Sequence, residues 1–251
     1  SAGNLIPGIK YILELTNDNG EVFDRREFSS LDTSRKSCRF AIVSCMNDNS
    51  GAKMHTMWAA LQRENCDFVI FLGDTCYADV NNSEKTEASY TRRYIETRKS
   101  LGWFRSPKLI PSFATWDDHD FGKNNADKSF PAGSFTGNLF KHFWGNQRNA
   151  SWQRRFGVGS VFEAFGQRFY LMDGRSFRDS PKTGGSHWGR EQTDWLISDI
   201  KRSHQPAWLM SGSQFFGGYL GKESFEADHA ENFRELLAEL GNASAPVAFA
   251  S

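Results

Sequence analysis

Side chains that can bind metal ions or move protons follow three short apolar runs of this 251-residue chain, at the point where each run ends. They are, in chain order, Cys45 after the run 39–43, GDTCYAD (73–79) after the run 68–72, and DDHD (117–120) after the run 110–116. Each run is typical of a buried strand. Because ligand sites in open α/β sheets lie at the carboxyl ends of strands, we expect these thiol, phenol, carboxylate and imidazole groups to converge.

Such a set of ligands predicts a metal centre. Carboxylates that cluster at one place repel one another and raise each other's pKa, and a bound cation removes that repulsion. Thiolate, phenolate and carboxylate together suit a hard, highly charged ion such as Fe3+. The surplus carboxylates and the nearby asparagines supply oxygen only, which suits a second ion such as Ca2+, or else Mg2+, Mn2+ or Zn2+. An Asp shared between two ions gives the two-metal arrangement of phosphoester hydrolysis.

Taken singly, each of these residues has a simpler explanation. Asp74 in a Gly-Asp pair is typical of a turn, and a lone Cys45 is typical of a small buried hydrophobe. Asp117 and Asp120 can be solvated or cap a helix, and His119 can be a hydrogen-bonded structural residue. Their joint occurrence at three successive strand ends is not what these separate explanations predict, so the metal centre is the favoured interpretation.

Composition excludes several other classes of protein. The chain has 30 Lys and Arg against 30 Asp and Glu, a formal net charge of zero. A protein that binds nucleic acid through its overall field would carry a basic excess, so no nucleic-acid-binding surface is predicted. No apolar run reaches the roughly 18 residues of a membrane helix. The four cysteines form no CxxC pair, and the residues at the N-terminus are not expected to form a signal peptide.

The elements that must position the metal centre alternate between strands and helices, which indicates an α/β architecture. Beyond the three runs above, strands are predicted as an N-terminal hairpin at 9–15 and 22–28, a second hairpin at 161–165 and 168–172, and runs at 207–211 and 246–250. Helices are predicted at 54–61, 84–100, 189–202 and 233–240.

The chain resembles the PhoD-like alkaline phosphatase family of the metallophosphoesterases. The matching blocks are FAIVSC (40–45), FLGDTCYAD (71–79), ATWDDHDFGKNNAD (114–127), RFYLMDGRSFRD (168–179), GREQTDWLISDI (189–200) and PAWLMSGSQ (206–214). The resemblance implies an α/β fold of the four-layer αββα sandwich type. It also implies that residues 1–34 are the last hairpin of an N-terminal, fibronectin-III-like β-sandwich domain, and that 35–251 is the metallophosphatase domain.

The resemblance assigns roles to particular residues. It implies that Cys45, Asp74 and Tyr77 bind iron, with Asp74 bridging to the second ion. Asp118 would bind that second ion, and His119 would be the general acid that protonates the leaving oxygen.

Three further residues are candidates for contact with substrate. The resemblance implies that Asn124 or Asn125 contacts phosphate or calcium, although family members often carry Asn-Asp where this chain has Asn-Asn. Arg175 is a candidate phosphate clamp because a guanidinium binds phosphate oxygens with two parallel hydrogen bonds. A structural salt bridge is the alternative role for this arginine.

The implied function is metal-dependent hydrolysis of phosphate monoesters or diesters, in the periplasm or outside the cell. A phospholipase D-type activity on the same scaffold is an alternative. In the family a Gly-Asp-x-His block with further metal ligands follows the strand that matches 247–251, whereas this sequence ends at Ser251. We therefore also expect an incomplete catalytic domain, and a catalytically silent binding module is the third interpretation.

Overall fold

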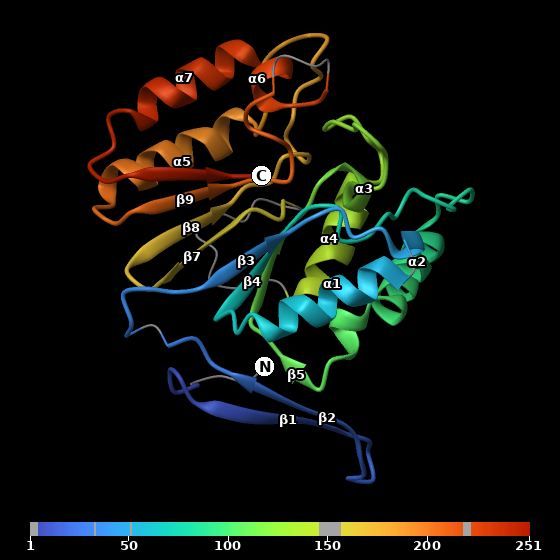
Figure 1. The fold of residues 1–251 in the computed structure, drawn as a ribbon. Helices are drawn as coiled ribbons and strands as arrows, with labels where there is room; N and C mark the ends of the chain where they lie inside the picture. The colour runs from blue at the N-terminus through green and yellow to red at the C-terminus, as the bar shows by residue number, and fades with distance from the viewer. Residues whose placement is uncertain (1–4, 33, 51, 146–156, 218–221) are drawn as a thin grey trace.

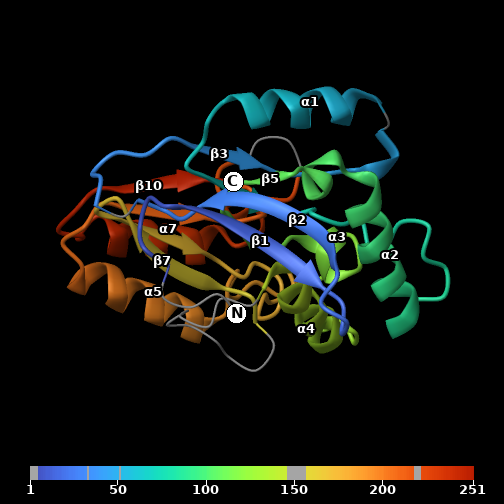
Figure 2. The same cartoon turned by 90° about the horizontal axis from the view of Figure 1, so that it is seen from below.

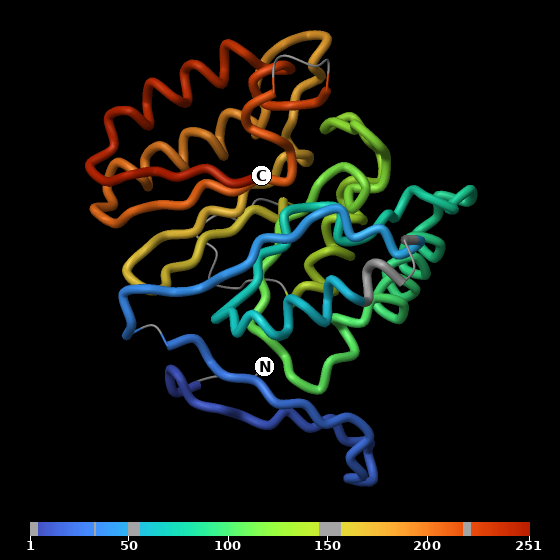
Figure 3. The backbone as a smooth tube through the Cα atoms, viewed as in Figure 1, coloured from blue at the N-terminus to red at the C-terminus, as the bar shows by residue number. Residues whose placement is uncertain are grey.

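The computed structural model describes residues 5–32, 34–50, 52–145, 157–217 and 222–251, which form a mixed α/β fold (Figure 1). Two sheets form its centre, and helices lie on the outer side of each. Figure 3 follows the backbone from the N-terminal hairpin at the bottom to the C-terminal helices at the top. The predicted α/β class is confirmed.

The first sheet carries the loops that the sequence singles out. It consists of three parallel strands in the order β3-β4-β6, namely β3 (Phe40–Val43), β4 (Phe68–Leu72) and β6 (Ser112–Thr115). Every residue of β4 is buried, because this central strand is covered on both faces. Since the three strands are parallel, their carboxyl ends lie at the same edge of the sheet.

Helices cover the outer face of this sheet. They are α1 (Ala52–Arg63), α2 (Glu87–Ser100), α4 (Gly133–Trp144) and the 3-10 helix η2 (Gly102–Arg105). Trp58 of α1 and Trp103 of η2 join Phe71 of β4 in one buried aromatic group. Thr86 caps the start of α2 by accepting a hydrogen bond from the Ser89 amide, which explains why this polar helix begins where it does.

The second sheet has the order β10-β9-β8-β7 and is parallel except for the hairpin β7–β8. Its strands are β7 (Ser160–Ala164), β8 (Gln167–Leu171), β9 (Ala207–Met210) and β10 (Val247–Ala250). Helices α5 (Arg190–Arg202) and α7 (Ala230–Leu240) pack on its outer face, and the short α6 (Phe225–Asp228) precedes α7. These positions agree with the strands and helices predicted from the sequence.

Aromatic side chains fill the space between the two sheets. The rings of Phe68 and Phe169 meet edge to face at 5.3 Å, and Phe40 meets Trp208 in the same way at 5.2 Å. Such pairs add stability beyond the apolar area they bury. This interior holds the two sheets together and thereby fixes where the carboxyl ends of β3, β4 and β6 lie.

The N-terminal hairpin lies against one end of this body, and a view from below shows it crossing that end (Figure 2). It comprises β1 (Lys10–Thr16) and β2 (Val22–Ser29), and β2 also pairs with the short β5 (Lys108–Leu109). Most of its side chains are exposed, including apolar ones such as Ile12 and Phe23. The hairpin therefore attaches to the body mainly through one strand edge.

Two features differ from the sequence-based expectation. The run 110–116, predicted as one strand, is preceded by β5 and begins its own pairing only at Ser112. Pro111 separates the two strands because it has no N–H for a ladder, while its carbonyl accepts from the Val69 amide. Helix α4 was not predicted, because its glycines and aromatics give a weak helical signal.

Candidate metal centre

The loops that follow β3, β4 and β6 are joined by backbone hydrogen bonds. The Cys45 amide donates to the Gly73 carbonyl at 3.3 Å, and the Met46 amide donates to the Asp74 carbonyl at 2.8 Å. The Gly73 amide donates to the Thr115 carbonyl at 3.0 Å. The three strand ends therefore form one connected unit, as the sequence predicted from their order and ending residues.

The backbone at this unit is held in an unusual conformation. Cys45 and Asp74 both have positive φ, 55° and 51°, a left-handed geometry that is uncommon for residues with side chains. Gly73, also at positive φ, lies so close to the next loop that an added Cβ would be 2.4 Å from Cβ of Asp117. Such geometry persists only where surrounding contacts enforce it, and it clusters at functional sites.

Five of the predicted site residues meet here. Ligand atoms of Asp74, Asp118 and His119 all lie within 4.8 Å of one another. The Cys45 thiol lies 3.6 Å from Oδ2 of Asp74, and the Tyr77 hydroxyl interacts with both of these groups. Side chains from three separate loops therefore present sulfur, oxygen and nitrogen ligands around one position.

The negative charges of the carboxylates in this cluster are poorly balanced by nearby positive charges. Burial, together with the charges of Asp120, Asp117 and Asp118, raises the pKa of Asp74 to about 8. Burial also raises the pKa of Asp120 to about 7, although hydrogen bonds oppose the rise. A carboxylate with such a pKa is costly to ionise where it stands, and a cation beside it would remove that cost.

The pKa values of the Cys45 thiol and the Tyr77 phenol are raised as well. Burial first, and then the charge of Asp74, raise the pKa of Cys45 and raise that of Tyr77 well above its ordinary range. Both groups therefore stay protonated at neutral pH without a metal ion. Because metal ligands of these types must be deprotonated, a bound cation would have to displace both protons, which an ion of high charge does most readily.

His119 is held from outside the cluster by Asp79. Its Nδ1 lies 2.7 Å from Oδ1 of Asp79, and its ring lies 4.3 Å from the ring of Tyr77. Burial lowers the pKa of His119, but the hydrogen bond with Asp79 and the charges of Asp74 and Asp118 outweigh that effect and raise it to about 9. The imidazole is thus protonated at neutral pH, and Nε2 is the nitrogen that remains for the cluster.

Sequence reasoning missed the role of Asp79. This residue closes the FLGDTCYAD block, two positions after Tyr77, so the block itself carried the signal. Its second oxygen accepts from the Asn124 amide at 3.0 Å. Asp79 therefore joins the loop after β4 to both the imidazole and the segment that follows α3 (Asp118–Phe121).

The other two carboxylates of the DDHD segment have structural partners. Asp120 is fully buried and accepts hydrogen bonds from the Thr75 hydroxyl at 2.5 Å and the Cys76 amide at 2.8 Å. Asp117 accepts from Nε of Arg175 at 2.7 Å. Asp120 also accepts from the Asp117 amide at 3.1 Å, in a capping box at the start of α3, which agrees with the capping role that the sequence allowed. Asp120 is not solvated, and these contacts leave Asp74 and Asp118 as the carboxylates of the centre.

Asn124 and Asn125 lie beside the cluster, with exposed side chains. The Asn125 amide donates to Oδ2 of Asp118 at 2.6 Å, and Asn125 has a positive φ of 54°. The two residues therefore approach the centre through their backbone N–H groups. Their side chains are exposed to solvent.

Arg175 is fully buried and lies in an ion-pair network. Its five N–H donors go to Asp117, to both carboxylate oxygens of Glu223, to the Ala126 carbonyl and to the Ser213 hydroxyl. In this arrangement no donor remains for a phosphate oxygen. The geometry supports the salt-bridge alternative, and Glu223, which sequence reasoning did not single out, is the partner that accounts for it.

One atom indicates that the cluster suits a cation. Asp74 is only 8 % exposed, and its Oδ1 is buried without a hydrogen-bond partner among the described residues. An unpaired buried carboxylate oxygen is costly unless a cation or a donor occupies the space beside it. The flanking Cys45, Tyr77 and Asp118 can supply the remaining ligands, so the residues present fit a metal ion.

Comparisons with known proteins agree with this geometry. A family model described as PhoD-like phosphatase matches residues 40–233. No curated protein sequence matches the chain. The solved structure of PhoD is similar with a TM-score of 0.73 and 18% identity, over 98% of this chain and 56% of that chain. A purple acid phosphatase from yellow lupin (Lupinus luteus) seeds has a TM-score of 0.58 and 17% identity, over 92% of this chain and 42% of that chain. This chain thus spans about half the length of these structures or less, and the likenesses show the shared fold.

Proposed function

Because the chain belongs to the PhoD-like phosphatase family, we propose that its metal centre hydrolyses phosphate monoesters or diesters with the help of two bound metal ions. The observation that carries this proposal is the buried Oδ1 of Asp74, which has no hydrogen-bond partner among the described residues, in a carboxylate that lies within 4.8 Å of ligand atoms of Asp118 and His119. Asp74 would be the shared carboxylate that a two-metal site requires. The similar fold of PhoD supports the same function.

We assign the ligands from the chemistry of the side chains. Cys45, Tyr77 and Asp74 would hold Fe3+, because a thiol and a phenol whose pKa values are raised need a highly charged ion to displace their protons. Asp74 and Asp118 would hold the second ion, and their oxygen ligands suit Ca2+, with Mg2+, Mn2+ or Zn2+ as substitutes. Bound there, the ions would supply charge neutralisation and Lewis-acid activation of water and of the phosphoryl group.

A residue of this chain would supply the proton that the leaving oxygen takes up. With its pKa raised to about 9, His119 carries a proton at neutral pH, and Asp79 holds Nδ1 so that Nε2 is the donor. His119 therefore acts as the general acid toward the leaving oxygen. The side chains of Asn124 and Asn125 would donate to phosphate oxygens. Arg175 orients Asp117 and is left out of the substrate site.

The test is hydrolysis of chromogenic esters by the chain reconstituted with iron and calcium. We expect p-nitrophenyl phosphate or bis(p-nitrophenyl) phosphate to be hydrolysed, with iron and calcium bound in stoichiometric amounts. The Asp118→Asn variant keeps the shape of the side chain and is the control for metal-independent cleavage.

Other outcomes decide among the alternatives. Preferential cleavage of phosphatidylcholine would favour the phospholipase D-type activity. A folded protein that binds no metal and cleaves no ester would contradict the proposal and favour a silent binding module. A concentrated iron-loaded sample should be coloured by charge transfer from the Tyr77 phenolate to Fe3+, and a colourless one would contradict Tyr77 as a ligand.

Three broader predictions belong to the same proposal. Residues 1–34 and 35–251 would be the end of a β-sandwich domain and the phosphatase domain, and the latter would be a four-layer αββα sandwich. Export to the periplasm or the cell exterior is proposed from the family resemblance. None of the described helices has both the length and the apolar character needed to cross a membrane.

A further inference from the structure

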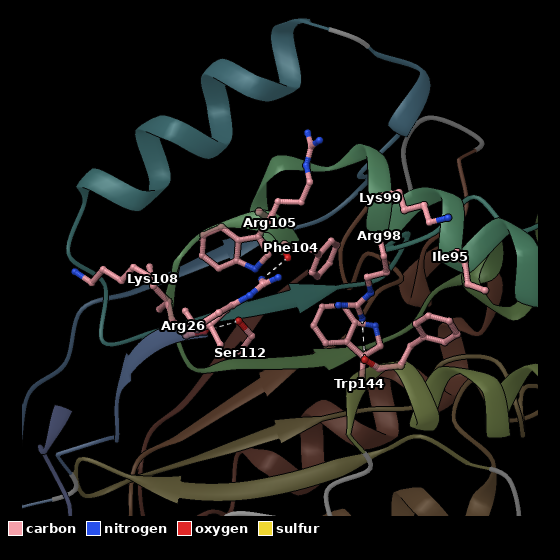
Figure 4. Close-up of a pocket in the computed structure, with 13 residues that line it drawn as sticks. Arg26, Ile95, Arg98, Lys99, Phe104, Arg105, Lys108, Ser112 and Trp144 are labelled. Atoms are coloured by element: carbon pink, nitrogen blue, oxygen red, sulfur yellow. Dashed lines mark hydrogen bonds between the residues drawn. The ribbon is translucent and has the colours of Figure 1, made fainter. Parts of the chain in front are cut away.

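A pocket apart from the metal centre lies on the helix-covered side of the first sheet, where the hairpin meets the body. It has a volume of about 880 Å³. It is lined by residues of β2, α2, η2, β5, α4 and the segment that follows β5. Figure 4 shows it in close-up. We call it the arginine pocket; its lining residues are Arg26, Ile95, Arg98, Lys99, Trp103, Phe104, Arg105, Lys108, Leu109, Ile110, Ser112, Phe143 and Trp144. None of the metal-centre residues is among them.

The charge of the arginine pocket has one sign. Five of its lining residues are cationic and none is acidic, in a chain whose charges balance to zero overall. Arg26 forms an ion pair with Asp24 at 2.9 Å, outside the lining, but its Nη2 group has no hydrogen-bond partner among the described residues. Like charges gathered in a recess attract an anion.

Arg98 is the central cation. Its guanidinium lies 3.8 Å from the ring centre of Phe104 and 4.5 Å from that of Trp144, so two aromatic rings hold it. Its one hydrogen bond among the described residues goes to the Phe143 carbonyl at 3.0 Å, and no carboxylate pairs with it there. Burial lowers the pKa of Arg98 to about 10. A stacked guanidinium keeps its edge donors for an anion, and this one lacks a counter-ion.

The arrangement of the cations and the apolar side chains limits the class of ligand that the pocket can bind. Arg26 enters from β2 on one side and Arg98 from α2 on the other, while Lys99 and Lys108 point outward at opposite ends (Figure 4). Apolar side chains, including Leu109 and Ile110, line the space between them. A volume of about 880 Å³ is typical of a site for an organic molecule and exceeds what a bare phosphate ion needs.

We propose that the arginine pocket binds a small organic phosphate with a planar aromatic group, of the size of a nucleoside diphosphate. The phosphates would lie between Arg26 and Arg98, and the aromatic group would pack on the apolar wall. The site is separate from the metal centre, so it binds its ligand without hydrolysing it. One contact joins the two regions, since Nε1 of Trp144 donates to the Thr75 hydroxyl at 3.3 Å, next to Asp74.

The test is calorimetric titration of the full chain with ADP, inorganic phosphate, adenosine and a twelve-residue oligodeoxythymidylate. We expect ADP to bind with a stoichiometry of one and more tightly than phosphate or adenosine. The Asp118→Asn variant, which disables the metal centre, should bind ADP as the parent chain does. Failure of the proposed hydrolysis therefore leaves this binding intact, and the two proposals are tested separately.

Variants locate the binding. Arg98→Gln should weaken ADP binding by about 10-fold or more, because a charge-assisted hydrogen bond to phosphate is lost. Arg98 is packed between rings, so the exposed pair Lys99→Gln and Lys108→Gln gives a second test that leaves the core intact, with an expected loss of about 3-fold. The matched control changes Lys36 and Lys182 to Gln, which removes the same charge from exposed positions elsewhere and should have no effect.

Four results would overturn the proposal. One is no saturable ADP binding up to about 1 mM, a limit that corresponds to very weak association. Another is phosphate or adenosine alone binding as tightly as ADP. A third is an ADP affinity that stays unchanged both in Arg98→Gln and in the double variant of Lys99 and Lys108, or an ADP affinity that is lost in Asp118→Asn. Tighter binding of the oligonucleotide than of ADP would replace the proposal with a single-stranded nucleic acid surface.

Discussion

The metal centre and the arginine pocket carry uncompensated charge of opposite sign in a chain with no net charge. Burial moves their central groups in opposite directions, raising the pKa of Asp74 to about 8 and lowering that of Arg98 to about 10. In each case burial disfavours the charged form, and a counter-ion would offset that cost. At neutral pH Asp74 is mostly protonated, whereas Arg98 remains a cation. The comparison shows that the side chains gathered in each region, and not the overall charge, decide which ion that region attracts.

The two regions differ in how they are held. The metal centre stands on three loops joined by backbone hydrogen bonds, with Cys45 and Asp74 in left-handed geometry. The arginine pocket is formed by long side chains from separate elements, and Arg98 is positioned by stacking. We therefore expect changes at the metal centre to have larger effects than changes in the pocket.

Replacement of a metal ligand should have the largest effect. Asp74→Asn removes the carboxylate that we propose as the bridging ligand, and ester hydrolysis should fall on the order of 1,000-fold, since Lewis-acid stabilisation is worth several kcal/mol and 1.36 kcal/mol is tenfold in rate. Steady-state kinetics with a chromogenic ester measures this. ADP binding in the arginine pocket should be unchanged, and its loss would contradict the independence of the two regions.

The general acid comes next. His119→Gln should lower the rate by about 100-fold, within the usual range for proton transfer by a placed side chain. The charges of Asp74 and Asp118 contribute to the His119 pKa of about 9 in the metal-free chain. The metal-loaded parent chain should therefore lose activity with rising pH at or below about pH 9, where the proton of His119 is lost. The variant should lack this alkaline decline in a pH–rate profile. A decline of equal shape in both would rule out His119 as the acid.

Asp79 tests positioning without touching the reacting atoms. Asp79→Asn should reduce activity by about 10-fold, as is usual when a group that orients a metal-site residue is changed. Because Asp79 raises the pKa of His119, the alkaline decline should move to lower pH in the variant. A purely structural role would lower activity without moving the decline, so the pH profile separates the two explanations.

The stability of the metal-free protein should depend on pH, because the pKa values of Asp74 and His119 are raised in the folded chain. Without metal, the folded chain binds more protons than the unfolded chain between the ordinary pKa of Asp74 and its raised value of about 8, and His119, raised to about 9, acts in the same direction. The stability of the metal-free protein should therefore fall as the pH rises from 7 to 9. Thermal unfolding in the presence of a chelator measures this, and added Ca2+ should abolish the decline.

The contact between the two regions should have the smallest effect. Trp144→Phe removes the hydrogen bond to Thr75 and should weaken metal binding by no more than about 5-fold, because a neutral hydrogen bond contributes about 1 kcal/mol. The same variant keeps a ring beside Arg98. Metal titration of parent and variant measures the difference, and a much larger loss would mean that the regions act as one.

The sequence allowed the metal centre to be predicted because its residues follow strands directly. Strand periodicity and the carboxyl-end rule place Cys45, Asp74 and Asp118 at one sheet edge without any knowledge of side-chain contacts. The α/β class follows from the same pattern. The break at Pro111 could not be predicted in detail, because it depends on which strands pair with each side of the proline.

The contacts that the sequence did not reveal join residues far apart in the chain. The role of Arg175 depends on Glu223, 48 positions later, and its phosphate-clamp and salt-bridge roles look alike in sequence. The arginine pocket joins Arg26 of the hairpin with Arg98 of α2 and Trp144 of α4. No spacing rule relates these positions, since only the packing of the helices and the hairpin on the sheet brings them together.

The close approach of Gly73 to Asp117 has a consequence for which changes this chain can tolerate. Gly212 is similar, since an added Cβ would lie 2.5 Å from the Trp116 carbonyl and 2.7 Å from Cβ of Asp117. Even alanine at either position would push the loop after β6 away from its neighbours and separate Asp118 from Asp74. In a deep mutational scan, two residues that have no reactive group would therefore rank with the metal ligands among the least replaceable.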